Sequence, residues 1–511
     1  MTLRKPALAM AAIASLALAG CASNTPSSTG GGDGGQGQAQ TLTLGILGEP
    51  RSWDPSQAHV GHVLQPYQVA YDSLLLREPD GALSPMLATE WEYNEDNTVL
   101  TLDLRTDVTF SDGAKFDAEA AKANFDHFRE ANGPQMNQLR AVDSVAAVDE
   151  DTVELTLSAP DPSLEFYLSQ AAGLMGSPAA LGTESITTEP VGSGPYVMDK
   201  ASSVPGSQLV FTAREDYWNK DLQKFSSVTL KTLADITART NALVSGQVDA
   251  TILDPKAGKQ AEGSGMILES NQVDWTGLLL MDRGGEVVEP LADVRVRQAI
   301  NYAFDRQTIL DQVRLGRGSV TSQMFGPDSG AWVEDLEDRY TYDPEKAKEL
   351  LAEAGYSSGV TIEVPALPAE EPTLLAVLKQ QLSDVGITLN VGAPTTTTFT
   401  SDVAAKKYPV IQYNLFQGEP WVAINQLIST QALYNPFKTT TPELQALIDD
   451  VQTGGTEAAE KAQAVNEYVT ENAWFAPLFR IDQMYYHSPK ISVTPQVQQA
   501  VPSIYNYAPA K

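Results

Sequence analysis

The stretch DVRVRQAINYAFDR, residues 293–306, decides the fold of the second half of this chain of 511 residues. Asp293 can cap a helix, and apolar residues recur at helical spacing from Val296 to Phe304. The stretch therefore predicts a helix with one apolar face that packs into a core.

A second helix is predicted in YDPEKAKELLAEAGY, residues 342–356. Asp343 is its cap, Pro344 takes the first helical position, and Gly355 ends it. Elements of alternating type follow: strand VTIEVPAL (360–367), helix TLLAVLKQQLSDVG (373–386) and strand ITLNVG (387–392). This alternation predicts an α/β lobe.

The first half of the chain opens with sheet. Apolar residues alternate in TLTLGIL (41–47) and VLTLDLR (99–105), and strand signal returns in TVELTLSAP (152–160). Asp112-Gly113 lies between apolar runs and predicts a hairpin turn, after which Asp117 can cap a helix.

The N-terminus has the features of a signal peptide. Arg4 and Lys5 precede an apolar run of 13 residues, 7–19, which is too short to span a bilayer. The sequence LAGC at 18–21 resembles the lipobox of bacterial lipoproteins, in which the cysteine is lipidated. We therefore expect residues 1–20 to be a lipoprotein signal peptide and Cys21 to carry lipid. The alternative is an ordinary secretory signal in which Cys21 is incidental.

Residues 21–40 are rich in Gly, Ser and Gln, and predict a flexible tether. No later stretch approaches 18 consecutive apolar residues. We expect an extracytoplasmic body that is anchored to the bacterial cell membrane by lipid and does not span it.

Charge and cysteine content exclude several classes of protein. The chain has 34 Lys and Arg against 65 Asp and Glu, a formal charge of −31, so nucleic acid is not an expected partner. Its single cysteine excludes an intramolecular disulfide framework and a Cys-based zinc site. No G-x-x-x-x-G-K-[ST] motif is present, so the chain has no P-loop for ATP hydrolysis.

Two motifs suggest chemistry, but each has a simpler interpretation. GYSSG at 355–359 matches the nucleophile elbow of hydrolases, yet the predicted order here is helix before strand, the reverse of an elbow. His59 and His62 could share a metal with a carboxylate such as Asp54, but we favour two polar loop residues beside a cleft. We expect no catalytic residue, no metal site and no cofactor.

Seven stretches, taken in order, resemble the family 5 extracellular solute-binding proteins, the peptide, oligopeptide and nickel-type receptors of ABC importers. They are EPRSWDP (49–55), the DG hairpin with AEAAKANF, PVGSGPY (190–196), REDYWNK (214–220), ALVSGQVD (242–249), DVRVRQAINYAFDR (293–306) and YDPEKAKELLAEAGY (342–356). The resemblance runs from about residue 41 to the C-terminus.

The resemblance implies the two-lobed α/β fold of periplasmic binding proteins, with an extra domain inserted in the first lobe and hinge strands between the lobes. By position, the hinge would lie near 275–282 and 475–482. The implied first lobe is 41–66, 190–285 and 480–511, the extra domain is 67–189, and the second lobe is 286–479.

The resemblance also implies a ligand on the lobe edges that face the cleft. In peptide-binding relatives, an Asp in the loop equivalent to 413–425 holds the α-ammonium of the peptide. Here Phe416 or Gln417 replaces that acid, and Glu419 is the only acid in the loop, so peptide binding is in doubt. The expected ligand-binding residues are Trp53, His59, Trp275, Tyr413, Asn414, Phe416, Gln417, Glu419 and Trp421. Core packing is the alternative role for the aromatic ones.

The expected function is that of a monomeric receptor that closes on a small solute, peptide-like or amphiphilic, and presents it to the ABC permease, with separate ATPase subunits supplying energy. Two alternatives stay open at this point. The closed form could instead be read by a signalling partner, or the chain could be a secreted hydrolase that uses Ser357.

Overall fold

The computed structural model describes residues 41–365, 372–392 and 397–511. The predicted signal peptide, the tether and Cys21 lie outside these residues. No described helix combines the length and the hydropathy that a membrane-spanning segment needs.

A nine-stranded sheet runs through both lobes in the order β16-β12-β17-β11-β1-β10-β9-β8, with β13 paired to β17. Strand β1 pairs in parallel with β10 and β11, and the other pairs are antiparallel. The strands are β1 (Thr41–Ile46), β8 (Tyr196–Met198), β9 (Gln208–Ala213), β10 (Ser227–Thr232), β11 (Ala250–Leu253), β12 (Ile267–Leu280), β13 (Gly318–Val320), β16 (Val410–Phe416) and β17 (Phe475–His487).

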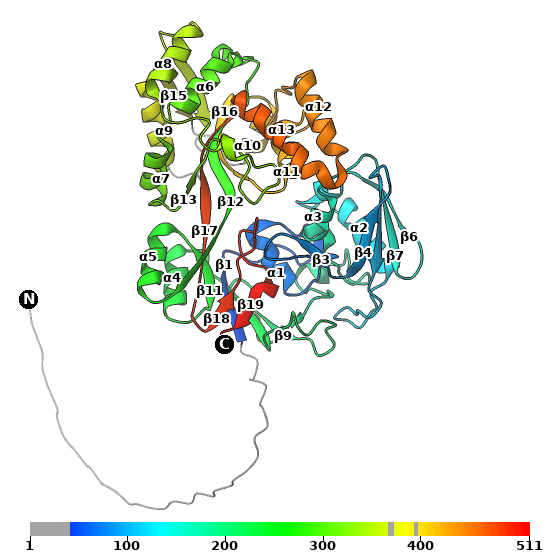
Figure 1. Cartoon of the computed structure of the whole chain (residues 1–511). Helices are drawn as coiled ribbons and strands as arrows, with labels where there is room; N and C mark the ends of the chain where they lie inside the picture. Colours follow the sequence, from blue (N-terminus) through cyan, green and yellow to red (C-terminus); the bar gives the residue numbers. More distant parts are fainter. Residues whose placement is uncertain (1–40, 366–371, 393–396) are drawn as a thin grey trace, which may run out of the picture. The chain divides into compact units, whose positions relative to one another are not determined.

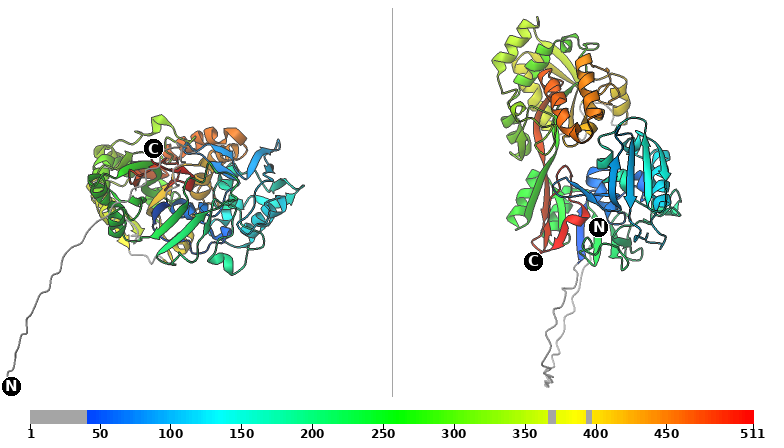
Figure 2. Two further views of the ribbon diagram at one scale, coloured as in Figure 1. Left: turned by 90° about the horizontal axis from the view of Figure 1, so that it is seen from below. Right: turned by 45° about the vertical axis from the view of Figure 1, so that its right-hand side comes forward.

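The long strands β12 and β17 connect the two lobes (Figure 1). Ile267 pairs with His487 at one end, and Leu279 pairs with Phe475 at the other. Figure 2 shows from a second direction that these strands continue from the part that holds β11 into the part that holds β16.

The crossing does not lie where the hinge was predicted in β12. Trp275 and Leu278 belong to hydrophobic cores of the second lobe, and Leu268 packs with the core around α4 (Ile236–Val244) and α5 (Pro255–Gly263) in the first lobe. Residues 275–280 are therefore fixed by packing within the second lobe, and the strand crosses before Trp275. The exact limits of the lobes stay predictions.

The region predicted to be the extra domain, 67–189, contains a four-stranded antiparallel sheet of order β4-β5-β7-β6, in contact with helix α2 (Ala118–Glu130). Its strands are β4 (Ala88–Tyr93), β5 (Val99–Leu104), β6 (Val142–Ala147) and β7 (Thr152–Leu157). The predicted turn is present, since Gly113 has a φ of 86° and Phe110 N–H donates to Ala114 O at 2.8 Å. The predicted cap is also confirmed, since Asp117 accepts from Ala120 N–H at 2.8 Å.

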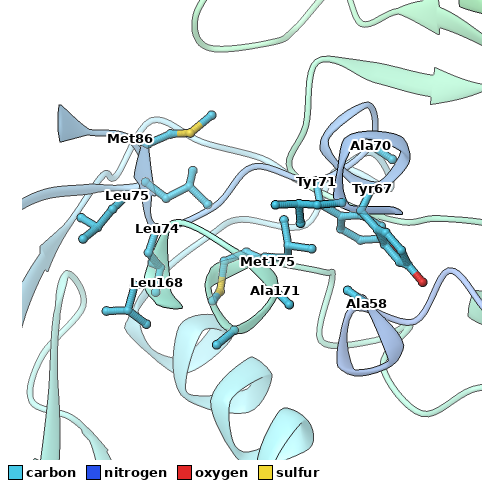
Figure 3. Close-up of a cluster of buried hydrophobic side chains, with 14 of the residues drawn as sticks. Ala58, Tyr67, Ala70, Tyr71, Leu74, Leu75, Met86, Leu168, Ala171 and Met175 are labelled. Carbon is cyan, nitrogen blue, oxygen red and sulfur yellow. The ribbon is translucent and has the colours of Figure 1, made fainter. Parts of the chain in front are cut away.

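One hydrophobic core joins the first lobe to the extra domain. Trp53 packs its ring 5.6 Å from that of Tyr67 and 5.5 Å from that of Phe211. Figure 3 shows part of this core, in which Ala58, from the segment after β1, and Met175, from the extra domain, belong to the same cluster. The remaining elements of this half are α1 (Leu64–Gln68), β2 (Leu75–Arg77), β3 (Leu83–Pro85), α3 (Leu164–Leu168), β18 (Ile491–Val493) and β19 (Tyr507–Pro509).

The second lobe confirms both helices predicted from local signals. Asp293 accepts from Arg295 N–H at 2.9 Å at the start of α6, and Asp343 accepts from Lys346 N–H at 2.8 Å at the start of α8. Gly355 follows α8 with a φ of 90°, a conformation that glycine adopts without strain. The elements are α6 (Val294–Tyr302), α7 (Arg306–Arg314), α8 (Pro344–Glu353), β14 (Val360–Pro365), α9 (Pro372–Asp384), β15 (Ile387–Gly392), α10 (Phe399–Ala404), α11 (Pro420–Ala423), α12 (Pro442–Gln452) and α13 (Ala458–Glu471).

Candidate functional site

Two adjoining cavities, of about 520 and about 300 Å³, lie where the extra domain meets the second lobe. We call this contact the seam: residues 160–166 of the extra domain against residues 416–421 and 451–459 of the second lobe. Pro162, Glu165 and Glu419 line both cavities. A solute in them would therefore contact both bodies at once.

The extra-domain side of the seam is a tight turn into α3. Asp161 Oδ1 accepts from Ser163 N–H at 3.0 Å, which fixes the turn before the helix begins. Leu164 is fully buried in the shared core, whereas Glu165 and Phe166 remain partly exposed on the side of the cavities.

The second-lobe side is the loop between β16 and α11. Glu419 caps α11, because its Oε1 accepts from Trp421 N–H at 3.2 Å. The same oxygen accepts from Ser163 Oγ at 3.0 Å, so one carboxylate ends a helix in one body and binds the other body. Phe416 lies beside it, with its ring centroid 6.3 Å from that of Phe166.

The larger cavity is acidic and aromatic. Among the described residues that line it, four are acidic, three are large aromatics and none is basic: Glu92, Asp161, Glu165, Glu419, Trp91, Tyr93 and Trp421. Burial raises the pKa of Glu419 to about 7 and that of Asp161 to about 6, and it also raises the pKa of Glu165. Partly buried carboxylates in a cavity that no basic residue lines favour a cationic group, and ring faces attract one as well.

The smaller cavity has a different character, because Arg77 lines it. This residue ends β2 and is only 6% exposed. Its Nη2 donates to Gln498 Oε1 at 2.7 Å, and its guanidinium carbon lies 4.9 Å from the ring centroid of Phe166.

The predicted ligand-binding residues do not all lie at the seam. Glu419 and Trp421 line the larger cavity, and Phe416 is adjacent. Gln417 is buried and donates through Nε2 to Gln272 O of β12 at 3.0 Å. On β16, Tyr413 stacks on Phe399 within the second lobe, with ring centroids 5.9 Å apart.

Four further residues of that prediction have other surroundings. Asn414, also on β16, is exposed and accepts a hydrogen bond from Thr276 Oγ1. Trp53 is 4% exposed in the shared core, and Trp275 is fully buried in a second-lobe core with its ring 5.7 Å from that of Phe475. His59 is exposed, and its Nδ1 accepts from its neighbour's backbone N–H. We therefore base the site on Phe416, Glu419 and Trp421.

The structure also shows the surroundings of the two motifs that suggested chemistry, GYSSG and the pair His59 and His62. In GYSSG, α8 precedes the motif and β14 follows it, which confirms the predicted order, and Ser357 is exposed. Asp54 binds His127 Nε2 at 2.9 Å, and His62 interacts with Gln483. In the described ranges, no group of three or more His, Cys, Asp or Glu residues is arranged to hold a metal ion.

Sequence reasoning missed Arg77, Asp161, Phe166 and Gln498. The run APDPS at 159–163 carried a usable signal, since Asp followed by Pro and Ser is typical of a turn before a helix. Arg77 and Gln498 carried none, because they are 421 residues apart and only the fold brings them together.

Comparison with known proteins places the chain in a family. The model of bacterial extracellular solute-binding proteins, family 5 Middle, matches residues 82–432, more than half of the chain. Glutathione-binding protein GsiB of Escherichia coli (strain K12) is 28% identical over 341 residues, 63% of this chain and 63% of that protein. The chain thus matches less than two thirds of the length of this curated relative.

Solved structures share the fold. HbpA2 from Haemophilus parasuis superposes with a TM-score of 0.81 at 20% identity, covering 92% of this chain and 100% of that one. DppA from Helicobacter pylori, solved with the peptide STSA, gives 0.76 at 19% identity, covering 92% and 98%. These matches confirm the two-lobed α/β fold of periplasmic binding proteins. With the family model, they show that the chain belongs to the bacterial extracellular solute-binding proteins of family 5.

Proposed function

We propose that this chain is the substrate-binding lipoprotein of an ABC importer, and that it captures a small peptide-like or amphiphilic solute between its lobes for delivery to a membrane permease. The observation that carries the proposal is the pair of adjoining cavities that share Glu419 at the seam. The names of relatives that bind glutathione or were solved with a peptide favour a peptide-like solute.

The solute would act by differential binding. Contacts with Phe166 on one side and with Trp421 on the other can exist together only when the seam is closed, so a bound solute shifts the population toward the closed form. In this proposal the chain makes and breaks no covalent bond, and separate subunits hydrolyse ATP.

The charge of the solute decides which seam residue matters most. Glu419 would hold a cationic group, because it is half-buried beside other acids and its hydrogen bonds come from uncharged groups. For a neutral solute, burial against Trp421 and Phe416 would dominate.

Isothermal titration with the solute that co-purifies from the native host, identified by native mass spectrometry, tests the site. With a cationic solute, Glu419→Gln should weaken binding by at least about tenfold, or about 1.4 kcal/mol. With a neutral one, Trp421→Ala should do so and Glu419→Gln should be nearly silent. X-ray scattering should show a smaller radius of gyration on binding. If neither variant weakens binding, the solute binds elsewhere.

Anchoring through Cys21 is a separate part of the proposal, and it would hold the body at the outer face of the cell membrane. Cys21→Ala should move the protein from the membrane fraction to the soluble fraction when cells are broken without detergent. A variant that fractionates like the wild type would contradict a lipid on Cys21. One acyl chain binds only weakly, so we expect more than one.

A further inference from the structure

We propose that Arg77 and Ser503 bind a small monovalent anion, a halide ion such as chloride, in an inner cavity that is not one of the two at the seam. The cavity lies where α1, β2 and the C-terminal residues 496–505 meet. The inference does not depend on the captured solute or on the proposed function.

The inner cavity is small and almost entirely polar. Its volume of about 10 Å³ admits one particle of about the size of a water molecule. Apart from Leu64 and Leu76, every residue that lines it carries a polar group on its side chain. This volume excludes a peptide, a sugar or sulfate, and among common anions only a halide comes close to it.

Three hydrogen-bond donors of the lining side chains are available to an occupant of the cavity. Arg77 is 6% exposed, and Ser503 is 2% exposed. In the part of the chain that the structure describes, Arg77 Nε, Arg77 Nη1 and Ser503 Oγ are buried and make no hydrogen bond. Buried donors are nearly always satisfied in folded proteins, and these three belong to residues that line one cavity. A single acceptor in the cavity would serve all three.

The third nitrogen of the guanidinium, Nη2, lies on the side of the seam. It donates to Gln498 Oε1 at 2.7 Å, and a Cβ built on Gly81 would lie 3.7 Å from it. Gln498 and Gly81 both line the seam cavity of about 300 Å³. Arg77 therefore lines both cavities, with Nη2 committed to the seam side and with Nε and Nη1 left for the inner cavity.

The occupant should carry a negative charge, because Arg77 has no counter-charge at bonding distance. Burial lowers the pKa of Arg77 to about 10, so the guanidinium stays charged at neutral pH. Among the described residues it forms no ion pair. Glu419 attracts it, but this carboxylate accepts its hydrogen bonds from Ser163 and Trp421 instead. A buried cation without a counter-charge is strongly unfavourable, and a water would satisfy the donors without neutralising the charge.

The anion would also steady one bond that bridges the seam. Gln498 accepts from Arg77 Nη2, and its own Nε2 donates to Asp328 O of the second lobe at 3.0 Å. An anion that fixes the guanidinium fixes the side chain that makes this bond. The site therefore links the concentration of the anion to the contact between the lobes.

Thermal unfolding in chloride solutions tests the site. Sodium gluconate, whose anion is too large for the cavity, keeps the ionic strength constant. A ligand that binds only the folded state stabilises it with the logarithm of ligand concentration, so the midpoint should rise by about 2 °C for each tenfold increase in chloride above the dissociation constant. Arg77→Gln should abolish this rise. Arg105→Gln, which removes an arginine already paired with Asp107, should keep it.

Gln498→Glu tests the need for charge while Arg77 stays in place. The new carboxylate would lie against Nη2 and neutralise the guanidinium from within the protein. Chloride should then bind at least about tenfold more weakly, and its effect on the midpoint should appear only at correspondingly higher concentrations. If Arg77→Gln does not fold, this variant and the crystals described next decide the question.

Crystals grown with sodium bromide give the direct readout, because bromide scatters anomalously. One anomalous peak is expected within hydrogen-bond distance of Arg77 Nε, Arg77 Nη1 and Ser503 Oγ. A water at this position without an anomalous peak, or a wild-type midpoint that chloride leaves unchanged, overturns the anion site and makes the occupant a buried water. A bromide peak without any effect of chloride in solution means binding at crystal concentration only, and it overturns the proposal as well.

Discussion

The first lobe and the extra domain share one large hydrophobic core, beside a smaller one around α4 and α5, and the second lobe has two cores of its own. One core centres on Trp275 and α13, and the other on α6, α8 and α9. A shared core makes the first lobe and the extra domain one body, because separating them would expose the rings of Trp53, Tyr67 and Phe211.

The contact between that body and the second lobe is of a different kind, since polar groups bridge it. Ser163 donates to Glu419, Gln452 Nε2 donates to Pro160 O at 3.1 Å, and Gln498 Nε2 donates to Asp328 O at 3.0 Å. Each such bond is worth only about 0.5–1.5 kcal/mol net, because water replaces it on opening. A shared apolar core thus joins the first lobe to the extra domain, whereas hydrogen bonds and one ring contact, Phe166 with Phe416, cross the seam.

The largest expected effect comes from breaking the shared core. Trp53→Ala should lower the free energy of unfolding by ~3–5 kcal/mol, since it leaves a cavity against Tyr67 and Phe211. In hydrogen exchange, β1 of the first lobe and β5 and β7 of the extra domain should lose protection together, while α6 and α8 keep theirs.

Trp275→Ala is the matched control, because it removes an equally buried ring from a second-lobe core. In this variant the hydrogen-exchange pattern should be reversed, and β16 and α13 of the second lobe should lose protection first. If Trp53→Ala exposes β1 and leaves β5 and β7 protected, the first lobe and the extra domain are separate bodies.

The same contrast explains how far sequence alone could go. Helices α6 and α8 were predictable because Asp293, Asp343 and Gly355 act on atoms a few residues away. The burial of Trp53 was not predictable, because an aromatic residue after a strand can face a core or a cleft. Its contact with Phe211, which is distant in sequence, places it in the core. At the seam, the resemblance pointed to Glu419. Its hydrogen-bond partner Ser163 was not predictable, because the two residues are 256 positions apart and no local sequence pattern links them.

A smaller effect is expected when the pH changes, and it concerns the seam alone. Burial raises the pKa of Glu419 to about 7 and that of Asp161 to about 6, so closing takes up protons. A carboxyl group whose pKa is raised favours the closed form in acid, and this contribution is lost as the pH rises through about 7. Without solute, the radius of gyration should therefore be smaller at about pH 5.5 than at about pH 8.

Glu419→Gln should remove most of that dependence, because the amide stays neutral at every pH. The other charged groups near this carboxyl are Asp161, Glu165 and Arg77, and Arg140 acts on Asp161. A solute with an ammonium group should show the opposite trend, binding more weakly in acid since it needs ionised Glu419. A pH profile that Glu419→Gln leaves unchanged would assign the titration to another group.

The smallest expected effect is the loss of one bridging bond. Gln452 ends α12 and donates to Pro160 O, so Gln452→Ala should weaken closing by at most about 1 kcal/mol, a few-fold loss of apparent affinity for the solute. Gln445→Ala on the same helix is the control, because its amide bonds only Asp449 within α12. The midpoint of thermal unfolding without solute should be nearly the same for both variants, since neither side chain belongs to a core. A loss of affinity beyond about tenfold in Gln452→Ala would mean that the seam is held by more than replaceable hydrogen bonds, and the contrast with the shared core would then fail.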